Sequence, residues 1–415
     1  MNQKIRLQLS GMMFLEYFVW GAWYVTMSNY LSKTLEFDGL QIGAAYGAVS
    51  VAALVSPFIV GMVADRFFAT EKILAVLHLV GGVLFLLIAN TTEFGLFYFL
   101  FQAYSILFMP TIALTNSISF QNLRDPNEQF PAVRVLGTIG FIAAVNVVSL
   151  SGFEASPMMF YIAGVSSFLL GMYCFFLPHT PPKDKGQKVT LKDVLGLKAL
   201  SLFKSPSFAV FFVASILICI PLSFYYAWAN PFLNALGMEA AGSKMTLGQL
   251  SEVFFMLIIP FFFRRLGVKW MLVVAMVAWA GRYVLFAYGD LGPSVWMLYA
   301  SILLHGICYD FFFVTGQMYV DNKAGKNFKS AAQGLITFAT YGVGMLIGNY
   351  ISGLVVDMYS TDTSKDWEAI WLVPAVFSAA VLIIFTVFFK EKKGQIAKVP
   401  TTKEATQELA ETKAV

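Results

Sequence analysis

The chain has 415 residues, of which 58% are hydrophobic and 13% are charged, and its mean hydropathy is +0.70. This composition excludes an ordinary soluble globular protein of this length and indicates an integral membrane protein. The net charge of +4 needs no nucleic-acid partner to explain it.

The sequence contains about a dozen apolar runs of roughly 20 residues, each long enough to cross ~30 Å of hydrocarbon as a helix. Strands of a membrane barrel would give alternating segments of ~10 residues, which are not seen here. The first run follows Lys4 and Arg6 and has no small-residue cleavage site after it, so we expect a retained helix. The predicted spans are residues 7–31, 40–62, 72–91, 94–118, 130–151, 156–177, 207–233, 246–263, 269–288, 294–320, 328–355 and 366–389.

The orientation of these spans follows from the basic residues of their connections, which are retained on the cytoplasmic side of membranes. Of the 28 Lys and Arg residues, 23 fall on the side that holds both termini. The opposite side holds only Lys33, Lys244 and Lys365. The sequence therefore predicts a multi-pass membrane protein whose N- and C-termini are cytoplasmic.

A long connection rich in Pro and Lys divides the spans into six plus six. We predict a bundle over 1–177, a cytoplasmic loop over 178–206, a second bundle over 207–389 and a polar tail over 390–415. The second and eighth spans both end in Pro-Phe followed by basic residues, in SPFIVGMVADRFF and IPFFFRRLGVK, which favours parallel repeats. Two six-helix bundles related in this way are typical of the major facilitator superfamily, with substrate bound between them near the midplane.

The turn after the second span resembles the signature of that superfamily. Gly61-x-x-x-Asp65-Arg66 supplies its Asp and basic residue, although Phe68 and Ala69 stand where further Gly and basic residues are usual. The resemblance implies that Asp65 and Arg66 form a cytoplasmic gate.

Few ionisable groups remain at membrane depth once the loops are set aside. Each costs at least ~2.5 kcal/mol at the bilayer centre, so each should face the bundle interior, a wet cavity or, near a span end, the headgroups. Arg134 lies close enough to a span end either to reach the headgroups or to face a cavity, and Arg282 either reaches the headgroups or pairs locally. The whole set is Glu16, Arg134, Glu252, Arg282 and Asp310, with His78 and His305.

Several of these groups share helix faces with other polar or aromatic side chains. Arg134, Thr138 and Phe141 are spaced i, i+4 and i+7, and Gln249 and Glu252 are spaced i and i+3. The tenth span has His305 and Tyr309 at i and i+4, with Asp310 next to Tyr309. Such a set could hydrogen-bond a small polar molecule while stacking on its flat part.

The balance of charge at membrane depth points to a proton site. Three acids against two arginines leave one excess negative charge in a low dielectric, which favours protonation of one acid. Glu252 and Asp310 are the first candidates for proton coupling. Glu16 is a third, with plain helix packing as its alternative.

Several long blocks resemble the nucleoside:proton symporter family of bacterial inner membranes. They include FPAVRVLGTIGFIAAVNVVSLSGFE, GQLSEVFFMLIIPFFFRRLGVKWML and the H-G-x-x-Y-D-F-F of the tenth span, and the similarity covers essentially the whole chain. The resemblance implies that Arg134, Thr138 and Phe141 contact the nucleoside, and that Gln249 binds substrate. It also implies that Glu252 binds substrate or proton, and it places Tyr309 at an aromatic position beside the acid Asp310.

The seventh span departs from this family. Members known to carry nucleosides have two side-chain amides there, and in SFYYAWANPF these positions are Ser223 and Tyr226. Altered base preference and a different polar solute are both consistent with the loss of two amides. We retain Ser223 and Tyr226 as predicted substrate-binding positions.

The sequence thus predicts an all-α integral membrane transporter with twelve transmembrane helices that imports nucleosides with protons. A carrier of another sugar-like or nucleobase-like solute, an uncoupled facilitator and an exporter remain alternatives. No catalytic site is expected, because neither the G-x-G-D motif of intramembrane aspartyl proteases nor a G-x-x-x-x-G-K-[ST] phosphate loop occurs. We expect no cofactor and no metal site, and a monomer in the lipid bilayer.

Overall fold

The computed structural model describes residues 3–59, 69–181, 197–324, 329–361 and 364–390. Within these ranges the chain is almost entirely helical, and a single β-bridge joins Ser360 to Lys365. The predicted gate residues Asp65 and Arg66 lie outside the described residues, as does most of the predicted loop 178–206.

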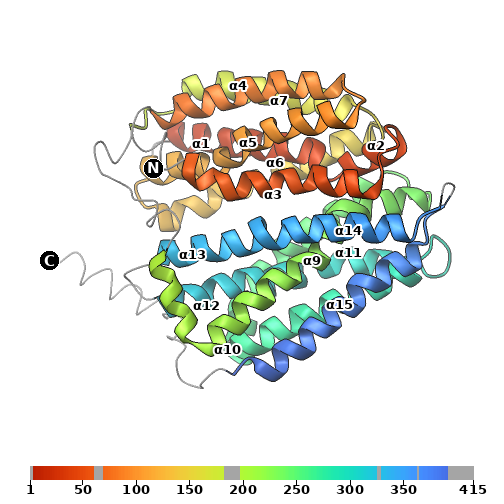
Figure 1. The fold of residues 1–415 in the computed structure, drawn as a ribbon. Helices are drawn as coiled ribbons and strands as arrows, with labels where there is room; N and C mark the ends of the chain where they lie inside the picture. Colours follow the sequence, from red (N-terminus) through yellow and green to blue (C-terminus); the bar gives the residue numbers. More distant parts are fainter. Residues whose placement is uncertain (1–2, 60–68, 182–196, 325–328, 362–363, 391–415) are drawn as a thin grey trace.

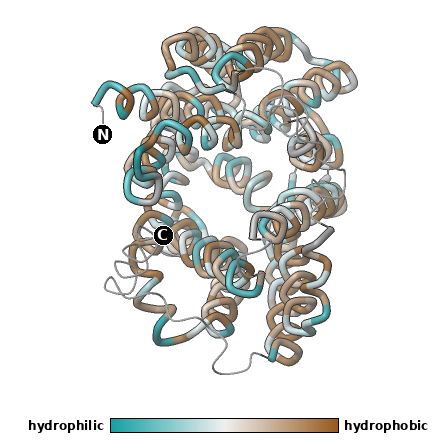
Figure 2. Tube along the Cα trace, turned by 90° about the vertical axis from the view of Figure 1, so that its left-hand side faces the viewer, coloured by the Kyte–Doolittle hydropathy of each residue, from teal (hydrophilic) through white to brown (hydrophobic). Residues whose placement is uncertain are grey.

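The helices form two groups that lie against each other along their lengths (Figure 1). Figure 2, seen from the end of the molecule that carries the N-terminus, shows the same groups end on. The first group contains α1 (Gln3–Tyr24), α2 (Met27–Lys33), α3 (Gly39–Ile59), α4 (Thr70–Ala89), α5 (Phe94–Asn122), α6 (Pro126–Leu150), α7 (Met158–Tyr173) and η2 (Cys174–Phe176). The second contains η3 (Leu197–Lys204), α9 (Pro206–Ala235), α10 (Ala241–Tyr288), α11 (Val295–Tyr309), η4 (Asp310–Val314), α12 (Thr315–Ala324), α13 (Lys329–Thr337), η5 (Phe338–Gly344), α14 (Met345–Met358) and α15 (Trp367–Phe388).

Ten helical segments of the described chain are long and apolar enough to cross a membrane. One of them, α10, has 48 residues and would be about 72 Å long if straight, more than twice the thickness of the hydrocarbon layer. It is interrupted at Gly267, whose φ of 67° and ψ of 177° are not helical, and therefore comprises two crossings. With α10 divided and α1 included, the described helices supply the twelve predicted crossings.

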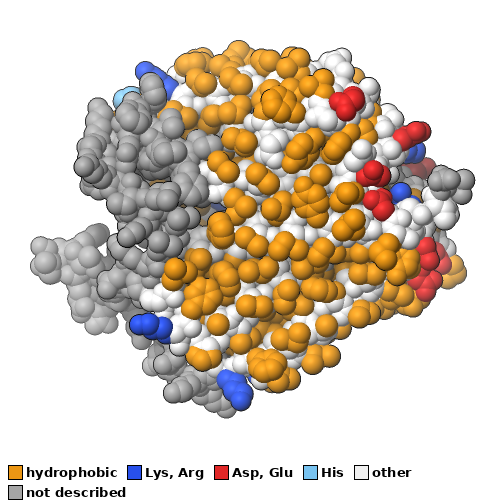
Figure 3. All heavy atoms as spheres, viewed as in Figure 1, with side chains coloured by type: hydrophobic (Ala, Val, Ile, Leu, Met, Phe, Trp, Pro, Cys, Tyr) orange, Lys and Arg blue, Asp and Glu red, His pale blue; other side chains and the backbone are white. Residues whose placement is uncertain are grey.

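The outer surface is apolar where a lipid bilayer would contact it. Large apolar side chains such as Phe99, Leu257 and Ile383 are each at least 65% exposed, which water would disfavour but hydrocarbon would not. Figure 3 shows apolar side chains covering the middle of one face, with Asp and Glu at the end opposite the termini. This distribution is that of an integral membrane protein, in agreement with the prediction.

Aromatic side chains pack the interior of each group. In the first group, Trp23 contacts Phe101 with ring centroids 5.1 Å apart. In the second, Tyr283 stacks on Trp371 at 5.8 Å and an interplanar angle of 9°. These rigid interiors hold the helix faces that the two groups turn toward each other.

The two groups are joined by hydrogen bonds at the end opposite the termini. The Glu154 side chain, which follows α6, accepts hydrogen bonds from Nδ2 of Asn230 at 2.9 Å and of Asn234 at 2.7 Å, both on α9. It also accepts from the backbone N–H of Gly242 at 2.8 Å, at the start of α10, and from the Ser149 hydroxyl. We call these contacts of Glu154 the outer latch.

A second contact at the same end joins α3 to α14. The Asp357 carboxylate accepts from the backbone N–H groups of Gly39 at 2.6 Å and Leu40 at 2.9 Å, at the first turn of α3. The helix backbones then run so close that a Cβ at Gly43 would lie 3.2 Å from the carbonyl carbon of Asn349. Both contacts close this end of the space between the groups.

Candidate functional site

A cavity of about 190 Å³ lies between the two groups, on the terminus side of these contacts. Ligand pockets for drug-sized molecules are larger, roughly 300–1,000 Å³, so this cavity suits one small solute. The first group lines it with Tyr17, Trp20, Tyr24, Val25, Tyr46, Val49, Ser50, Ala53, Met109, Arg134, Thr138 and Phe141. The second lines it with Tyr225, Tyr226, Met245, Gln249, Glu252, His305, Tyr309, Tyr341, Met345 and Asn349.

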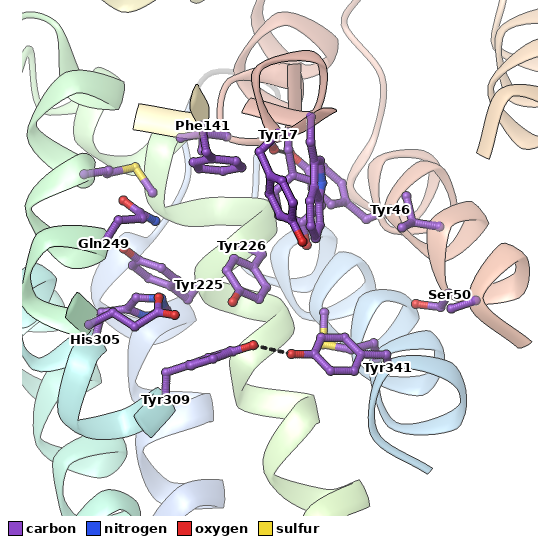
Figure 4. Close-up of a pocket in the computed structure, with 18 of the residues that line it drawn as sticks. Tyr17, Tyr46, Ser50, Phe141, Tyr225, Tyr226, Gln249, His305, Tyr309 and Tyr341 are labelled. Carbon is purple, nitrogen blue, oxygen red and sulfur yellow. Dashed lines mark hydrogen bonds between the residues drawn. The ribbon is translucent and has the colours of Figure 1, made fainter. Parts of the chain in front are cut away.

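Aromatic rings from both groups form much of the wall (Figure 4). Trp20 meets Phe141 edge to face at 6.1 Å, and Tyr24 meets Tyr226 across the boundary between the groups at 5.5 Å. The hydroxyls of Tyr309 and Tyr341 are 2.5 Å apart and share a hydrogen bond. Faces of this kind can stack on a planar solute, while their hydroxyls supply polar contacts.

The predicted face of α6 points into the cavity. Arg134, Thr138 and Phe141 all line it, and the Arg134 guanidinium carbon lies 4.1 Å from the centre of the Tyr17 ring. That cation–π contact holds the charge in the wall. Of the two alternatives for Arg134, the structure therefore shows the cavity position and not the headgroup position.

Gln249 and Glu252 lie opposite, on the first half of α10, and also line the cavity. The charges of Glu252 and Arg134 are within electrostatic reach of each other. Tyr226 and Tyr309 complete the predicted residues that reach the wall. Among the described residues, the cavity wall thus contains one cation, one carboxyl group, the two side-chain amides of Gln249 and Asn349, an imidazole and several hydroxyls.

Two predicted substrate-binding residues are not among the described residues that line the cavity. The Ser223 side chain is fully buried, and its hydroxyl donates to the Cys219 carbonyl oxygen of its own helix at 2.8 Å. A serine hydroxyl is too short to reach past the helix once it makes this bond. Ser223 therefore lies behind the wall, where its hydroxyl is 3.7 Å from the sulfur of the lining residue Met345.

Asp310 is also fully buried behind the wall. It begins the π-helical turn η4, and neither of its carboxylate oxygens has a hydrogen-bond partner among the described residues. Its charge is within electrostatic reach of Glu252. Buried polar groups are usually hydrogen-bonded, so a fully buried carboxyl without a well-formed hydrogen bond to the described residues is unusual.

Glu16 lies inside the first group and does not line the cavity. It accepts a hydrogen bond from the Thr111 hydroxyl at 2.6 Å and pairs with Nε2 of His78 at 2.9 Å. His78 in turn contacts the Ser167 hydroxyl through Nδ1 at 3.1 Å. We call Glu16, His78, Thr111 and Ser167 the Glu16 network.

The comparisons with known proteins agree with this arrangement. The sequence model of the nucleoside H⁺ symporters matches residues 1–394. The chain belongs to the nucleoside H⁺ symporter family. It is therefore a membrane transporter and not an enzyme.

Relatives in this family cover nearly the full length of the chain. The putative nucleoside transporter YegT of Escherichia coli is 42% identical, over 95% of this chain and 96% of its own. The xanthosine permease of Escherichia coli is 38% identical, over 93% of this chain and 96% of its own. The nucleoside permease NupG of Escherichia coli is 35% identical, over 96% of this chain and 98% of its own.

Solved structures support the same fold. The crystal structure of NupG superposes with a TM-score of 0.87 and covers 94% of this chain and all of NupG. A bacterial homologue of the human lysosomal transporter Spinster, at 12% identity and a TM-score of 0.69, shares the fold alone. The predicted major-facilitator fold of this nucleoside H⁺ symporter is confirmed.

Sequence reasoning missed part of the cavity wall of this symporter. Tyr17, Trp20 and Tyr24 are spaced i, i+3 and i+7 on α1, a pattern that could have revealed one face. Tyr46 and Tyr341 carry no charge and stand in mainly apolar spans of a chain with 18 tyrosines, so no signal in the sequence distinguished them. The sequence indicates that His305 lies at membrane depth but does not assign it to the site.

Proposed function

We propose that this chain imports nucleosides together with protons across the bacterial inner membrane by alternating access. The cavity carries this proposal, because it is built by both groups and combines aromatic faces with Arg134 and Glu252. Family membership and relatives named as nucleoside transporters or permeases support the substrate class. A nucleoside has the flat base and the polar ribose that such a wall would recognise.

The roles that we propose for the wall residues follow from their chemistry. Phe141, Tyr226 and Tyr309 stack on the flat part of the solute, while Arg134, Thr138 and Gln249 hydrogen-bond its polar groups. Ser223 supports the solute indirectly, since it contacts the lining residue Met345 from behind.

Glu252 is the proposed proton site. It faces the cavity, within electrostatic reach of both Arg134 and the second carboxyl, Asp310. Repulsion between the two carboxylates in a low dielectric favours protonation of one of them. Asp310 is the second candidate, and a proton bound at this pair would travel with the solute when the groups rock.

We further propose that both termini are cytoplasmic and that the protein acts as a monomer of two six-helix bundles, 1–177 and 207–389. The distribution of Lys and Arg supports this orientation. The outer latch would then close the periplasmic end in the state described here, with the cavity reached from the cytoplasm. Asp65 and Arg66 would form the opposing cytoplasmic gate.

Uptake of radiolabelled uridine and adenosine tests the proposal, in cells that lack nucleoside transport and express the protein. We expect uptake that a protonophore reduces. Glu252→Gln should reduce accumulation to the level seen with the protonophore, because glutamine cannot bind and release a proton at this position. The exposed Glu239→Gln is the matched control and should behave as the unaltered protein.

Three outcomes would change the proposal. Uptake that ignores the protonophore would indicate a facilitator without proton coupling. Protonophore-sensitive uptake that survives in Glu252→Gln would move the proton site to Asp310. If well-expressed protein carries no nucleoside, the two residues that replace the family's amides, Ser223 and Tyr226, have redirected the fold to another solute.

A further inference from the structure

Arg282 is a buried cation that the roles proposed above leave unexplained. Its side chain is fully buried on the second half of α10, and it forms no ion pair with any described carboxylate. Its Nε and Nη2 atoms have no hydrogen-bond partner among the described residues. A buried charge of this kind is costly, so the contacts that it does make are informative.

Arg282 makes two contacts that lead toward the cavity. Its guanidinium carbon lies 3.8 Å from the centre of the Tyr225 ring, a close cation–π contact. Its Nη1 atom lies 3.2 Å from Nδ1 of His305. The Tyr225 and His305 rings stack on each other at 4.9 Å, so the three side chains form one unit.

The contact between Arg282 and His305 fixes the proton of the imidazole. A guanidinium is always charged in proteins and can only donate hydrogen bonds. Nδ1 of His305 must therefore be the acceptor and carry no proton, and the single ring proton of the neutral imidazole is on Nε2. A doubly protonated ring would oppose one N–H to another and place two positive charges together.

The free side of His305 belongs to the cavity. His305 lines the cavity together with Tyr309 and Gln249 (Figure 4). Its Nε2 atom has no hydrogen-bond partner among the described residues. It is also not among the unpartnered polar atoms that are completely inaccessible, so it retains some exposed surface. An N–H group is thus presented to whatever occupies the cavity.

We propose that His305 is a hydrogen-bond donor to the solute and that Arg282 is the positioning residue that makes it so. This inference rests on the proposed function, and it adds a selectivity rule to it. The nucleoside must offer an acceptor at this position, which is a ring nitrogen or carbonyl oxygen of the base or an oxygen of the ribose. An analogue with C–H in place of that acceptor leaves the Nε2–H group without a partner.

Binding of a nucleoside analogue series to the purified protein tests the selectivity rule. The probes are adenosine with its 1-, 3- and 7-deaza analogues, uridine with its 2-thio and 4-thio analogues, and the 2′-, 3′- and 5′-deoxy forms of both. We expect one analogue of a bound nucleoside to bind about tenfold more weakly, the value of one lost hydrogen bond. A base analogue identifies a base acceptor, and a deoxy analogue identifies a ribose acceptor.

Two variants connect that loss to His305 and Arg282. In His305→Phe, which keeps a ring but removes the donor, the parent nucleoside should bind about as weakly as the analogue, so the difference between them disappears. In Arg282→Met the difference should shrink, because both neutral imidazole forms become accessible. Arg282→Lys should recover part of it, since an ammonium also donates to Nδ1.

The proton position can be measured without any nucleoside. The chain has three histidines, His78, His179 and His305, so ¹⁵N-histidine labelling gives a spectrum that a single His305→Gln variant assigns. We expect an unprotonated Nδ1 and a protonated Nε2 at His305, and a mixture of forms in Arg282→Met. This readout would not move if Arg282 only filled space.

The failures of the two proposals can be told apart. If no nucleoside binds the unaltered protein, the proposed substrate class is wrong. The role of His305 as a donor to a nucleoside is then wrong as well, and the ¹⁵N spectrum still shows which imidazole form is present. If nucleosides bind but no analogue loses affinity, or if Nδ1 of His305 carries a proton, the inference is overturned and the proposed function stands.

Discussion

The two groups of helices each bury a histidine against a charged or ionisable partner, and the two sites differ in how completely their polar atoms are used. In the Glu16 network, both nitrogens of His78 are hydrogen-bonded, and both oxygens of Glu16 have partners. In the second group, His305 uses one nitrogen, and two nitrogens of Arg282 have no partner among the described residues. Only the second site reaches the cavity.

The donors and acceptors of the Glu16 network are all used within the network. The Ser167 hydroxyl donates its one proton to the His78 carbonyl oxygen at 2.8 Å, so Nδ1 of His78 must donate to Ser167. Glu16 and Nε2 of His78 then share one proton between them, and the pair is neutral as a whole whichever atom holds it. Such a network stabilises helix packing and has no capacity left for a solute. Unused donors and acceptors therefore mark the binding region better than buried charge does.

The outer latch gives the strongest test of this comparison. Glu154 is as fully hydrogen-bonded as Glu16, but its hydrogen bonds join the two groups. Glu154→Ala removes the acceptor of four hydrogen bonds. We expect the closed outer end to lose roughly 2–5 kcal/mol of stability, the usual cost of truncating a buried hydrogen-bonded charge at an interface. Such a loss should shift the protein toward states that are open at this end.

Labelling of a cysteine in the cavity measures that shift. Met245 lines the cavity close to the latch, and the three native cysteines are buried elsewhere, so Met245→Cys supplies a reporter. A membrane-impermeant thiol reagent added from the outer side should react faster in the Glu154→Ala background than in the Glu239→Ala control. An unchanged rate with a lowered melting temperature would mean that the latch only supports the fold.

Glu16 gives the next largest expected effect and tests whether its network is purely structural. Glu16→Leu leaves Nε2 of His78 without its partner, at a cost of roughly 1–3 kcal/mol. The Thr111 hydroxyl loses Glu16 but keeps the Phe108 carbonyl oxygen of its own helix as an acceptor at 2.6 Å. We expect a clear drop in melting temperature in detergent and an unchanged affinity for the transported nucleoside. Thermal unfolding and equilibrium binding on the same preparation measure both.

Glu16→Gln is the matched variant, because it keeps the shape of the side chain and loses the shared proton. It should lie between the unaltered protein and Glu16→Leu in stability. Loss of proton-driven accumulation in Glu16→Gln at normal stability would contradict our interpretation and would make Glu16 a proton-coupling residue, as the sequence allows.

The sequence predicted the spans and part of the cavity wall from the cost of charge at membrane depth and from helical periodicity. The same two principles limit what it could predict. Membrane depth makes charge expensive, so Arg134 and Glu252 were identifiable, and helical periodicity placed Thr138 and Phe141 on the same face as Arg134. Periodicity gives relative positions on a helix but not the direction in which the helix is turned. The burial of Ser223 against Met345 depends on that direction.

Asp310 shows a second limit. The turn from Asp310 to Val314 is π-helical, as is Phe338–Gly344, and each adds a residue to the turn of an otherwise α-helical span. An ideal period of 3.6 residues therefore loses its phase at these points. Asp310 and Tyr309 are neighbours in the sequence, and neighbours on a helix point in different directions, so Tyr309 lines the cavity while Asp310 lies behind it.

Ser167 provides the smallest and most discriminating change. Ser167→Ala removes the hydroxyl that contacts both Nδ1 and the backbone carbonyl oxygen of His78. The hydrogen bond between Glu16 and His78 remains. Hydrogen bonds between membrane helices are worth about 0.6 kcal/mol on average, so we expect a small fall in stability and no change in nucleoside binding or accumulation. Reversible unfolding in mixed micelles can resolve a difference of this size.

Ser215→Ala is the matched control, because Ser215 is equally buried and its hydroxyl bonds only to Phe211 of its own helix at 2.8 Å. Ser167→Ala should be less stable than Ser215→Ala, since only Ser167 joins two helices. A much larger loss, of roughly 3 kcal/mol or more, would mean that the hydroxyl sets the proton position on His78. The Glu16 network would then be coupled like the unit of Arg282 and His305, and completeness of hydrogen bonding would no longer separate the two sites.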